Sequence, residues 1–259
     1  MPKLKLEIAY DGTNYKGWQI QKNQPTIQGA IIKSCEEIFQ TKTFELYGSG
    51  RTDAGVHALG QVAHLEIKTK LEPDQIKIKL NEVLPSDIQI QDIKPMDPKF
   101  HARHDAVART YVYQISKLRS PFGNRYSWWL KEDLIAENMQ KVKEIYTGFK
   151  DYKSFGQQDP NEKSTLVEIK SVDVNVSENN ILITITGSHF LWNMVRRMVG
   201  VMVAAGRKKL QIPEIESFFK KPSNVPGRYT APPNGLFLEG VYYKGEKIRN
   251  EVRRPPLCI

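Results

Sequence analysis

The first clearly patterned segment of the chain alternates apolar and polar residues. In KLKLEIAY, residues 3–10, an apolar side chain falls at every second position, which is the period of a strand with one buried face. Alternating or apolar runs of similar length recur along the chain. They predict further strands at residues 61–67, 88–93, 109–115, 167–176, 180–187 and 235–243.

Between these strands, apolar residues recur at helical spacing. Thr26 precedes such a stripe and belongs to the residue types that cap helix N-termini, so a helix is expected to follow it. Pro85 ends a second helix, because proline has no backbone N–H to donate. Helices are predicted near residues 27–38, 73–84, 131–146 and 190–205.

Strands and helices alternate in both halves of the sequence, which predicts an α+β protein made of two similar β-α-β-type (ferredoxin/RRM-like) halves. The segment at 94–106 is rich in proline and charge and is expected to cross between them. The predicted halves are residues 1–98, with the GRTD segment, and 99–259, with RTYVY and MVRRMVG.

The composition indicates which kind of molecule the protein binds. The 259 residues have 40% hydrophobic and 26% charged side chains, as a globular protein does, but carry a net charge of +9 and a pI near 9.3. Such an excess of cations attracts polyanions, above all nucleic acid. A basic surface that only improves solubility is the alternative.

The cysteines and the N-terminus indicate a compartment. Two cysteines far apart, Cys35 and Cys258, argue against a disulfide framework or a zinc ribbon and suit a reducing environment. The first residues lack the apolar core of a signal peptide. A cytoplasmic protein is expected.

One glycine-rich segment, GSGRTDAGVHALG at 48–60, places Arg51 and Asp53 two residues apart. In an extended segment, residues two apart point to the same side, so both side chains would enter one space. The glycines permit close approach of another molecule to the backbone. The segment is therefore a candidate site, with a surface salt bridge in a flexible connection as the alternative.

The apolar helix predicted at 190–205 contains a second candidate. Trp192, Val195, Val199, Met202 and Val203 form one stripe on a helical projection, and Arg196 falls on its edge. A partly buried guanidinium needs a carboxylate or a phosphate, and Asp53 is an attractive partner. The alternative is that the aliphatic part of the Arg196 side chain lies along the apolar surface while its guanidinium reaches water. The next residue, Arg197, points away and is expected in solvent or on a phosphate.

Cations and aromatic residues are mixed in FHARHDAVARTYVY, residues 100–113. Sites for single-stranded nucleic acid combine cations near phosphates with rings that stack on bases. Tyr111 and Tyr113 share one face of the predicted strand, although such a pair also occurs in cores. His101 and His104 have no cysteine or carboxylate set that would complete a metal site, and no GxSxG motif supports a hydrolase.

Six blocks, in this order and spacing, resemble the tRNA pseudouridine synthase A family. They are AYDGTNYKGWQIQ, GRTDAGVHALGQVAH, LNEVLPSDI, FHARHDAVARTYVY, FLWNMVRRMVG and APPNGLFLEGVYY. The resemblance implies two α+β halves whose sheets line a central basic cleft. It also implies a homodimer that binds tRNA, with no cofactor and no metal, and isomerisation of uridine to pseudouridine at positions 38 to 40 of the anticodon stem-loop.

The resemblance also implies roles for single residues. Asp53 matches the catalytic aspartate, Arg51 an arginine linked to extruding the target nucleotide, and Tyr111 the tyrosine that stacks on the uracil. Arg196 matches the cation paired with the catalytic carboxylate, and Leu236 an apolar residue of the pocket wall.

Other matches concern contacts with the tRNA. A stretch that touches the tRNA corresponds to Phe100, His101, Ala102, Arg103 and His104, and a weaker match falls at 161–165. Arg228 and Tyr229 depart from the family pattern, which has smaller residues there. This departure concerns local RNA contacts and not the reaction.

Several alternatives remain open from the residues themselves. The Asp53 carboxylate, ionised at neutral pH, is suited to attack the sugar, to add to the uracil, or to act as a base. A non-catalytic RNA-binding protein or chaperone on the same scaffold explains the charge but gives no reason for Asp53. A synthase for other RNA sites, and a metal-dependent nuclease, are further rivals.

Overall fold

The structure is a computed structural model that describes residues 2–157, 164–249, 251, 253 and 255. It is a mixed α+β protein, as predicted. The chain forms two compact units, one of Met1–Val107 with Phe237–Arg253 and one of Ala108–Leu236. The last strand thus belongs with the N-terminal residues, unlike in the expected division into 1–98 and 99–259.

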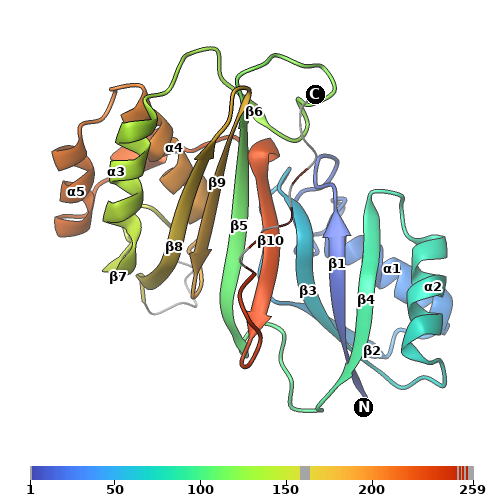
Figure 1. The fold of residues 1–259 in the computed structure, drawn as a ribbon. Coiled ribbons are helices and arrows are strands. Elements are labelled where there is room, and N and C mark those ends of the chain that lie inside the picture. The colour runs from blue at the N-terminus through green and yellow to red at the C-terminus, as the bar shows by residue number, and fades with distance from the viewer. Residues whose placement is uncertain (1, 158–163, 250, 252, 254, 256–259) are drawn as a thin grey trace. The chain divides into compact units, whose positions relative to one another are not determined.

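The first unit is built on a sheet with the strand order β4-β1-β3-β10 (Figure 1). Strand β1 is antiparallel to both β3 and β4. One edge of β3 is shared by two strands: β10 pairs in parallel with its start, and β2 pairs antiparallel with its end. The strands are β1 (Lys3–Tyr10), β2 (Phe44–Gly48), β3 (His57–Ile67), β4 (Ile88–Met96) and β10 (Leu236–Tyr243).

Two helices cover this sheet, α1 (Ile27–Phe39) and α2 (Pro73–Val83). The side chain of Thr26 accepts a hydrogen bond from the backbone N–H of Gly29, which confirms the predicted cap. Helix α2 starts with Pro73, in the first turn, where a backbone N–H would have no acceptor within the helix. It ends before Pro85, as expected. In β1 every second residue, Leu4 to Tyr10, is buried as the alternation predicts.

A C-terminal segment after β10 is tied to the same sheet by charged groups. Glu239 of β10 has no exposed surface, and its carboxylate accepts hydrogen bonds from Tyr242 and Arg249 at 2.9 and 3.1 Å. Arg253 donates to the carboxylate of Glu7 on β1. A buried carboxylate needs such donors, so these contacts explain how the strand tolerates an acid in its interior.

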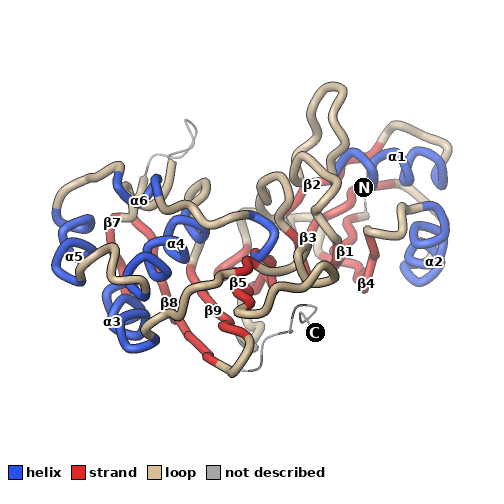
Figure 2. Tube along the Cα trace, turned by 90° about the horizontal axis from the view of Figure 1, so that it is seen from above, coloured by secondary structure: helices blue, strands red, loops and turns tan. Residues whose placement is uncertain are grey.

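The second unit has the strand order β5-β9-β8-β7, with the short β6 beside β5. Its helices lie beside the strands in Figure 2. The strands are β5 (Ala106–Ser116), β6 (Trp128–Trp129), β7 (Gly148–Asp151), β8 (Leu166–Val176) and β9 (Asn180–Gly187). The helices are α3 (Ala136–Tyr146), α4 (Met194–Gly206), α5 (Ile212–Lys220) and α6 (Val225–Arg228), followed by the 3-10 turn η1 (Pro233–Gly235).

Helix α4 is the buried helix of this unit, and it differs from the expected one. It begins at Met194 and not near residue 190, and Trp192 is 60% exposed, so the prediction that Trp192 joins its apolar stripe is wrong. Gly200 has the backbone of Tyr229 against it, where an added Cβ would lie 1.4 Å from the carbonyl oxygen. The helix is therefore enclosed by the segment that leads to β10.

In the described part of the chain, the helices are all too short or too polar to cross a lipid bilayer.

Candidate active site and RNA-binding residues

The segment with Arg51 and Asp53 connects β2 to β3 and is fastened at both ends. At its start, the backbone N–H of Ser49 donates to Val62 at 2.7 Å, and the side chain of Gln61 donates to the carbonyl of Gly50 at 3.2 Å. At its end, Val56 donates to the carbonyl of Asp53 at 3.2 Å. Although glycine-rich, this connection has a defined conformation.

Thr52 anchors the centre of this segment. Its hydroxyl lies 2.8 Å from the hydroxyl of Tyr10, and its carbonyl accepts a hydrogen bond from the backbone N–H of Trp18 at 3.1 Å. Thr52 is buried, Arg51 before it is exposed and Asp53 after it is half-buried. This alternation is what an extended segment gives, with Arg51 and Asp53 both facing away from the interior.

The block AYDGTNYKGW forms the other side of this anchor. An added Cβ at Gly12 would lie 2.0 Å from the carbonyl oxygen of Val56, and one at Gly17 would lie 2.5 Å from that of Thr52. Gly17 also has φ of +96°, a conformation that glycine adopts far more easily than other residues. The two segments therefore pack backbone to backbone. This close packing gives a structural reason why both occur among the blocks that resemble the family.

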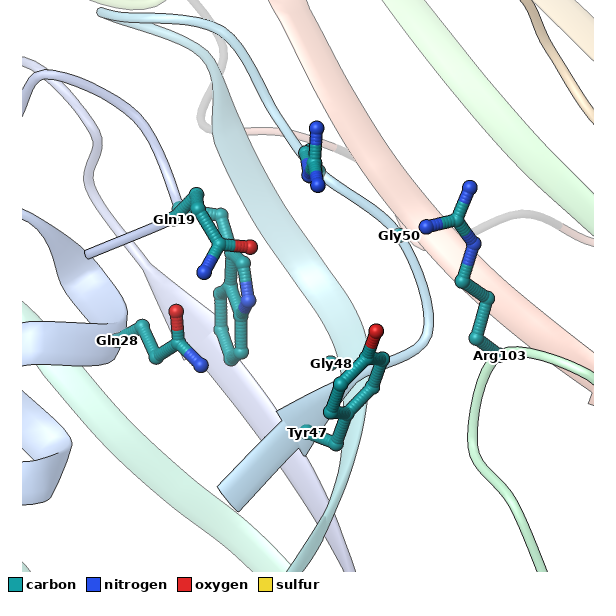
Figure 3. Close-up of a pocket in the computed structure, with 8 residues that line it drawn as sticks. Gln19, Gln28, Tyr47, Gly48, Gly50 and Arg103 are labelled. Carbon is teal, nitrogen blue, oxygen red and sulfur yellow. The ribbon is translucent and has the colours of Figure 1, made fainter. Parts of the chain in front are cut away.

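A pocket of about 110 Å³ opens beside the same segment (Figure 3). Arg51 and Arg103 line it, together with residues to which the sequence analysis assigned no role. The close-up shows the side chains of Gln19, Tyr47 and Arg103 extending toward one space from three different parts of the first unit. The lining residues are Trp18, Gln19, Gln28, Tyr47, Gly48, Gly50, Arg51 and Arg103.

The FHARH stretch divides into buried and accessible side chains. Phe100 and Ala102 are buried in the first unit, whereas His101 and Arg103 are half-buried and His104 is exposed. The buried pair belongs to the framework of the unit, since the backbone carbonyl of Ala102 accepts a hydrogen bond from the Tyr243 hydroxyl at 2.8 Å. Side-chain contact with RNA is thus open to three of these five residues.

A cluster of aromatic rings packs against the FHARH stretch. His64 of β3 stacks on Tyr47 at 5.8 Å between ring centroids and meets His101 at 4.8 Å, and its Nδ1 accepts a hydrogen bond from the N–H of Ala102 at 3.1 Å. Burial, with the nearby charges of His101 and Lys3, lowers the pKa of His64 to about 4. His64 is therefore neutral at physiological pH and acts as a structural ring.

In the second unit, the two tyrosines of RTYVY have different roles. Tyr113 is fully buried, and its hydroxyl donates to the carbonyl of Pro232 at 2.8 Å. Tyr111 is half-buried, and its ring meets the ring of Phe190 edge to face at 5.2 Å. Of the two, Tyr111 is thus the more exposed residue.

Arg196 is held by the segment that approaches β10. Its Nε donates to the carbonyl of Ala231 at 2.7 Å, and its Nη1 donates to Oδ1 of Asn193 at 3.1 Å. Asn193 precedes α4 in the left-handed conformation, with φ of +61°. The guanidinium is therefore oriented by two acceptors. Leu236, which begins β10, is buried.

Arg197, which was expected in solvent or on a phosphate, is not a fully solvated side chain. It is half-buried beside Gly227, its Nε is enclosed without a hydrogen-bond partner among the described residues, and burial lowers its pKa. The weaker candidate segment, 161–165, lies outside the described residues at positions 161–163.

Across the described ranges, no group of three or more His, Cys, Asp or Glu side chains is arranged to hold a metal ion. The chemical groups that the two units offer are a half-buried carboxylate, an oriented guanidinium and an accessible aromatic ring. Thr52, Tyr47 and Asn193 were missed by sequence reasoning. The only signal for them was their place in or next to glycine-rich or arginine-containing motifs. That place does not distinguish a residue that positions the site from one without a role in it.

Comparison with known proteins identifies a family. The model of a family described as tRNA pseudouridine synthase matches residues 8–105 and 143–244. A protein of Protochlamydia amoebophila, tRNA pseudouridine synthase A 1, is 36% identical over 247 residues, which cover 93% of this chain and 96% of that protein. tRNA pseudouridine synthase A of Thermodesulfovibrio yellowstonii is 37% identical, with 94% and 100% covered.

Both kinds of match extend over most of the chain, and the residues matched by the family model include Asp53 and Arg196. The chain therefore belongs to the tRNA pseudouridine synthase family, and it is an isomerase of uridine in tRNA.

Proposed function

We propose that this protein isomerises uridine to pseudouridine at positions 38 to 40 of the anticodon stem-loop, with Asp53 as the nucleophile. The observation that carries the proposal is the anchoring of Thr52. Because Thr52 is held by Tyr10 and Trp18, the neighbouring Asp53 is presented as a half-buried carboxylate on a fixed backbone. A positioned carboxylate is what a covalent attack on the ribose requires.

The target uridine must first leave the stacked helix, because no side chain reaches its glycosidic bond inside a stem. Flipping a nucleotide costs a few kcal/mol. Tyr111, with its accessible ring, replaces part of the lost stacking, which is worth about 1–3 kcal/mol per base. Arg51 either fills the vacated space or holds the distorted backbone.

The proposed reaction is balanced without any co-reactant. The Asp53 carboxylate attacks C1′ of the ribose, the C1′–N1 bond breaks, and the uracil leaves as an anion. The uracil turns, and its C5 attacks C1′, which releases the carboxylate. C5 then loses its proton to a base, either the freed Asp53 or Tyr111, and N1 ends protonated. Product and substrate have the same atoms.

Arg196 and Leu236 complete the site in this proposal. The Arg196 guanidinium, oriented by Ala231 and Asn193, keeps the carboxylate ionised and points it at the sugar. Leu236 provides an apolar wall, which is needed because water in the site would hydrolyse the cleaved sugar. His101, Arg103 and His104 contact the tRNA from outside the reacting centre.

The wider setting belongs to the same proposal. The protein binds the tRNA on a basic surface, works as a homodimer and acts in the cytoplasm. The net charge of +9 supports binding to a polyanion of this size. A non-catalytic RNA-binding role is not favoured, since an acid in the centre of such a surface would repel phosphate.

The test uses purified protein and tRNA transcripts that carry uridine at positions 38, 39 and 40 one at a time. We expect pseudouridine at each of these positions by mass spectrometry, and no strand cleavage on a denaturing gel. Pseudouridine only at other positions would contradict the substrate assignment. Cleaved RNA without pseudouridine would instead support a nuclease.

A further inference from the structure

The pocket beside Arg51 is polar and strongly basic. Of the residues that line it, two are arginines, Arg51 and Arg103, and none is an aspartate or glutamate. Tyr47, which is exposed, adds a hydroxyl, and Gln19, which is half-buried, adds an amide. The lining therefore offers hydrogen-bond donors with two positive charges, which is the set that recognises a phosphate group together with a neighbouring polar group.

The floor of this pocket is rigid. Trp18 is 1% exposed and packs on Gly48, where an added Cβ would lie 2.5 Å from its indole nitrogen. The amide of Gln28 is held at both ends, because its oxygen accepts from Ile20 at 3.0 Å and its nitrogen donates to the carbonyl of Leu46 at 3.0 Å. A ligand would find this floor already formed.

The wall formed by Tyr47 is also fixed. Its ring stacks on His64 and meets His101 edge to face at 5.0 Å. These contacts hold the ring from one side, and Figure 3 shows the hydroxyl of Tyr47 and the guanidinium of Arg103 both extending toward the segment of Gly48 and Gly50. A rigid aromatic side chain next to two cations is typical of sites that hold a nucleotide.

We propose that this pocket binds one phosphodiester of the tRNA strand next to the target uridine, between Arg51 and Arg103, with Tyr47 against the attached nucleotide. This inference rests on the proposed function and makes it more specific. It assigns Arg51 to the RNA backbone and not to the space that the flipped base leaves. It also makes Tyr47 and Gln19, to which the sequence analysis assigned no role, part of the substrate-binding surface.

The first test measures binding of an anticodon stem-loop RNA by fluorescence anisotropy. Arg103→Met should weaken binding about 10- to 30-fold at low salt and lower the slope of log Kd against log salt by about 1, since one phosphate contact is lost. Tyr47→Ala should weaken it about 3- to 10-fold, because a stacking contact is lost. Lys79→Met, which removes an exposed cation from α2, is the matched control and should change neither quantity.

The second test locates the contact. Single phosphates of the RNA around the target are replaced by uncharged methylphosphonates, and binding to the original protein and to Arg103→Met is compared. At one position, next to the target, the replacement should weaken binding to the original protein about 10-fold and leave binding to the variant unchanged. If every replacement weakens binding to both proteins equally, or if Arg103→Met behaves like Lys79→Met, the proposal is wrong.

These measurements separate this proposal from the one on function. They record binding only, while pseudouridine formation is measured on the unmodified RNA in parallel. If pseudouridine forms normally but no phosphate replacement distinguishes the original protein from Arg103→Met, only the pocket assignment is wrong. If one replacement does distinguish them but no pseudouridine forms at positions 38 to 40, the pocket assignment stands and the proposed substrate is wrong.

Discussion

The hydroxyl groups of Tyr10 and Thr52 lie 2.8 Å apart in the interior of the first unit. Tyr10 is the last residue of β1, and Thr52 is the residue between Arg51 and Asp53. One hydrogen bond thus connects the sheet to the centre of the segment that carries the proposed catalytic residue. The reactivity of Asp53 should depend on this bond, although neither hydroxyl touches the substrate in the proposed mechanism.

Tyr10→Phe tests that dependence. Removing the tyrosine hydroxyl leaves the buried hydroxyl of Thr52 without its partner, which should cost about 1–2 kcal/mol of the free energy of unfolding. The single-turnover rate of pseudouridine formation should also fall, by about 10-fold, because the carboxylate is less well positioned. The control is Tyr146→Phe, which removes another buried hydroxyl bond, to the carbonyl of Met198 at 3.0 Å. This control should lose similar stability and keep its rate; equal rate losses in both would contradict the account.

Gly17→Ala tests the contact between the two backbone segments. The substitution places a Cβ 2.5 Å from the carbonyl oxygen of Thr52 at a residue with φ of +96°. We expect a loss of about 2–4 kcal/mol in the free energy of unfolding, measured in urea, from clash and strain together. Gly245→Ala isolates the strain, since Gly245 has φ of +87° but nothing within 4 Å. A loss of the same size there would mean that the clash has no effect.

The secondary structure was largely predictable from the sequence because its signals are local. The alternation in KLKLEIAY, Thr26 as a cap and Pro85 as a stop each act within a few residues, and β1, α1 and α2 follow them. Strand β2 was missed because FELYG is only five residues long, so its alternation covers too few positions to stand out in the sequence. Helix α5 was missed as well, although its apolar residues have helical spacing.

The site was predictable only in part. Asp53 and Arg51 stand in a motif that is recognisable without a fold, and so does Arg196. The supports of the site come from residues far away in sequence, such as Tyr10 for Thr52 and Ala231 for Arg196. Nothing in the local sequence indicates these pairs, because chain topology determines which distant residues meet. The exposure of Trp192 was mispredicted for a related reason, since the helical pattern does not reveal where a helix begins.

Arg196→Leu should separate catalysis from binding. If the guanidinium orients the catalytic carboxylate, the single-turnover rate should fall by at least about 100-fold, which is about 2.7 kcal/mol of transition-state stabilisation. The Kd for tRNA should change by less than about 5-fold. Asn193→Ala, which removes the side-chain amide that accepts from Arg196, should give a smaller rate loss with the same unchanged Kd. Parallel and mild losses of rate and affinity in Arg196→Leu would contradict the proposed role.

The buried ring of His64 makes stability dependent on pH. Burial lowers its pKa to about 4 in the folded protein, against an ordinary value near 6.5. Between these values the unfolded chain binds a proton that the folded protein does not, so stability is highest above pH 6.5 and declines as the pH falls toward 4. The decline due to this residue should be on the order of 2–3 kcal/mol. Urea unfolding of His64→Gln at several pH values should show a shallower decline; an unchanged pH dependence would mean that another group causes it.

The central claim is that the carboxylate of Asp53 carries out the reaction. The most direct measurement compares the original protein and Asp53→Asn, which keeps the size of the side chain and removes its charge. Both are assayed for tRNA affinity and for single-turnover pseudouridine formation at positions 38 to 40. The account predicts a Kd within about 3-fold of the original and no detectable pseudouridine. A variant that still modifies the tRNA at the original rate would contradict it.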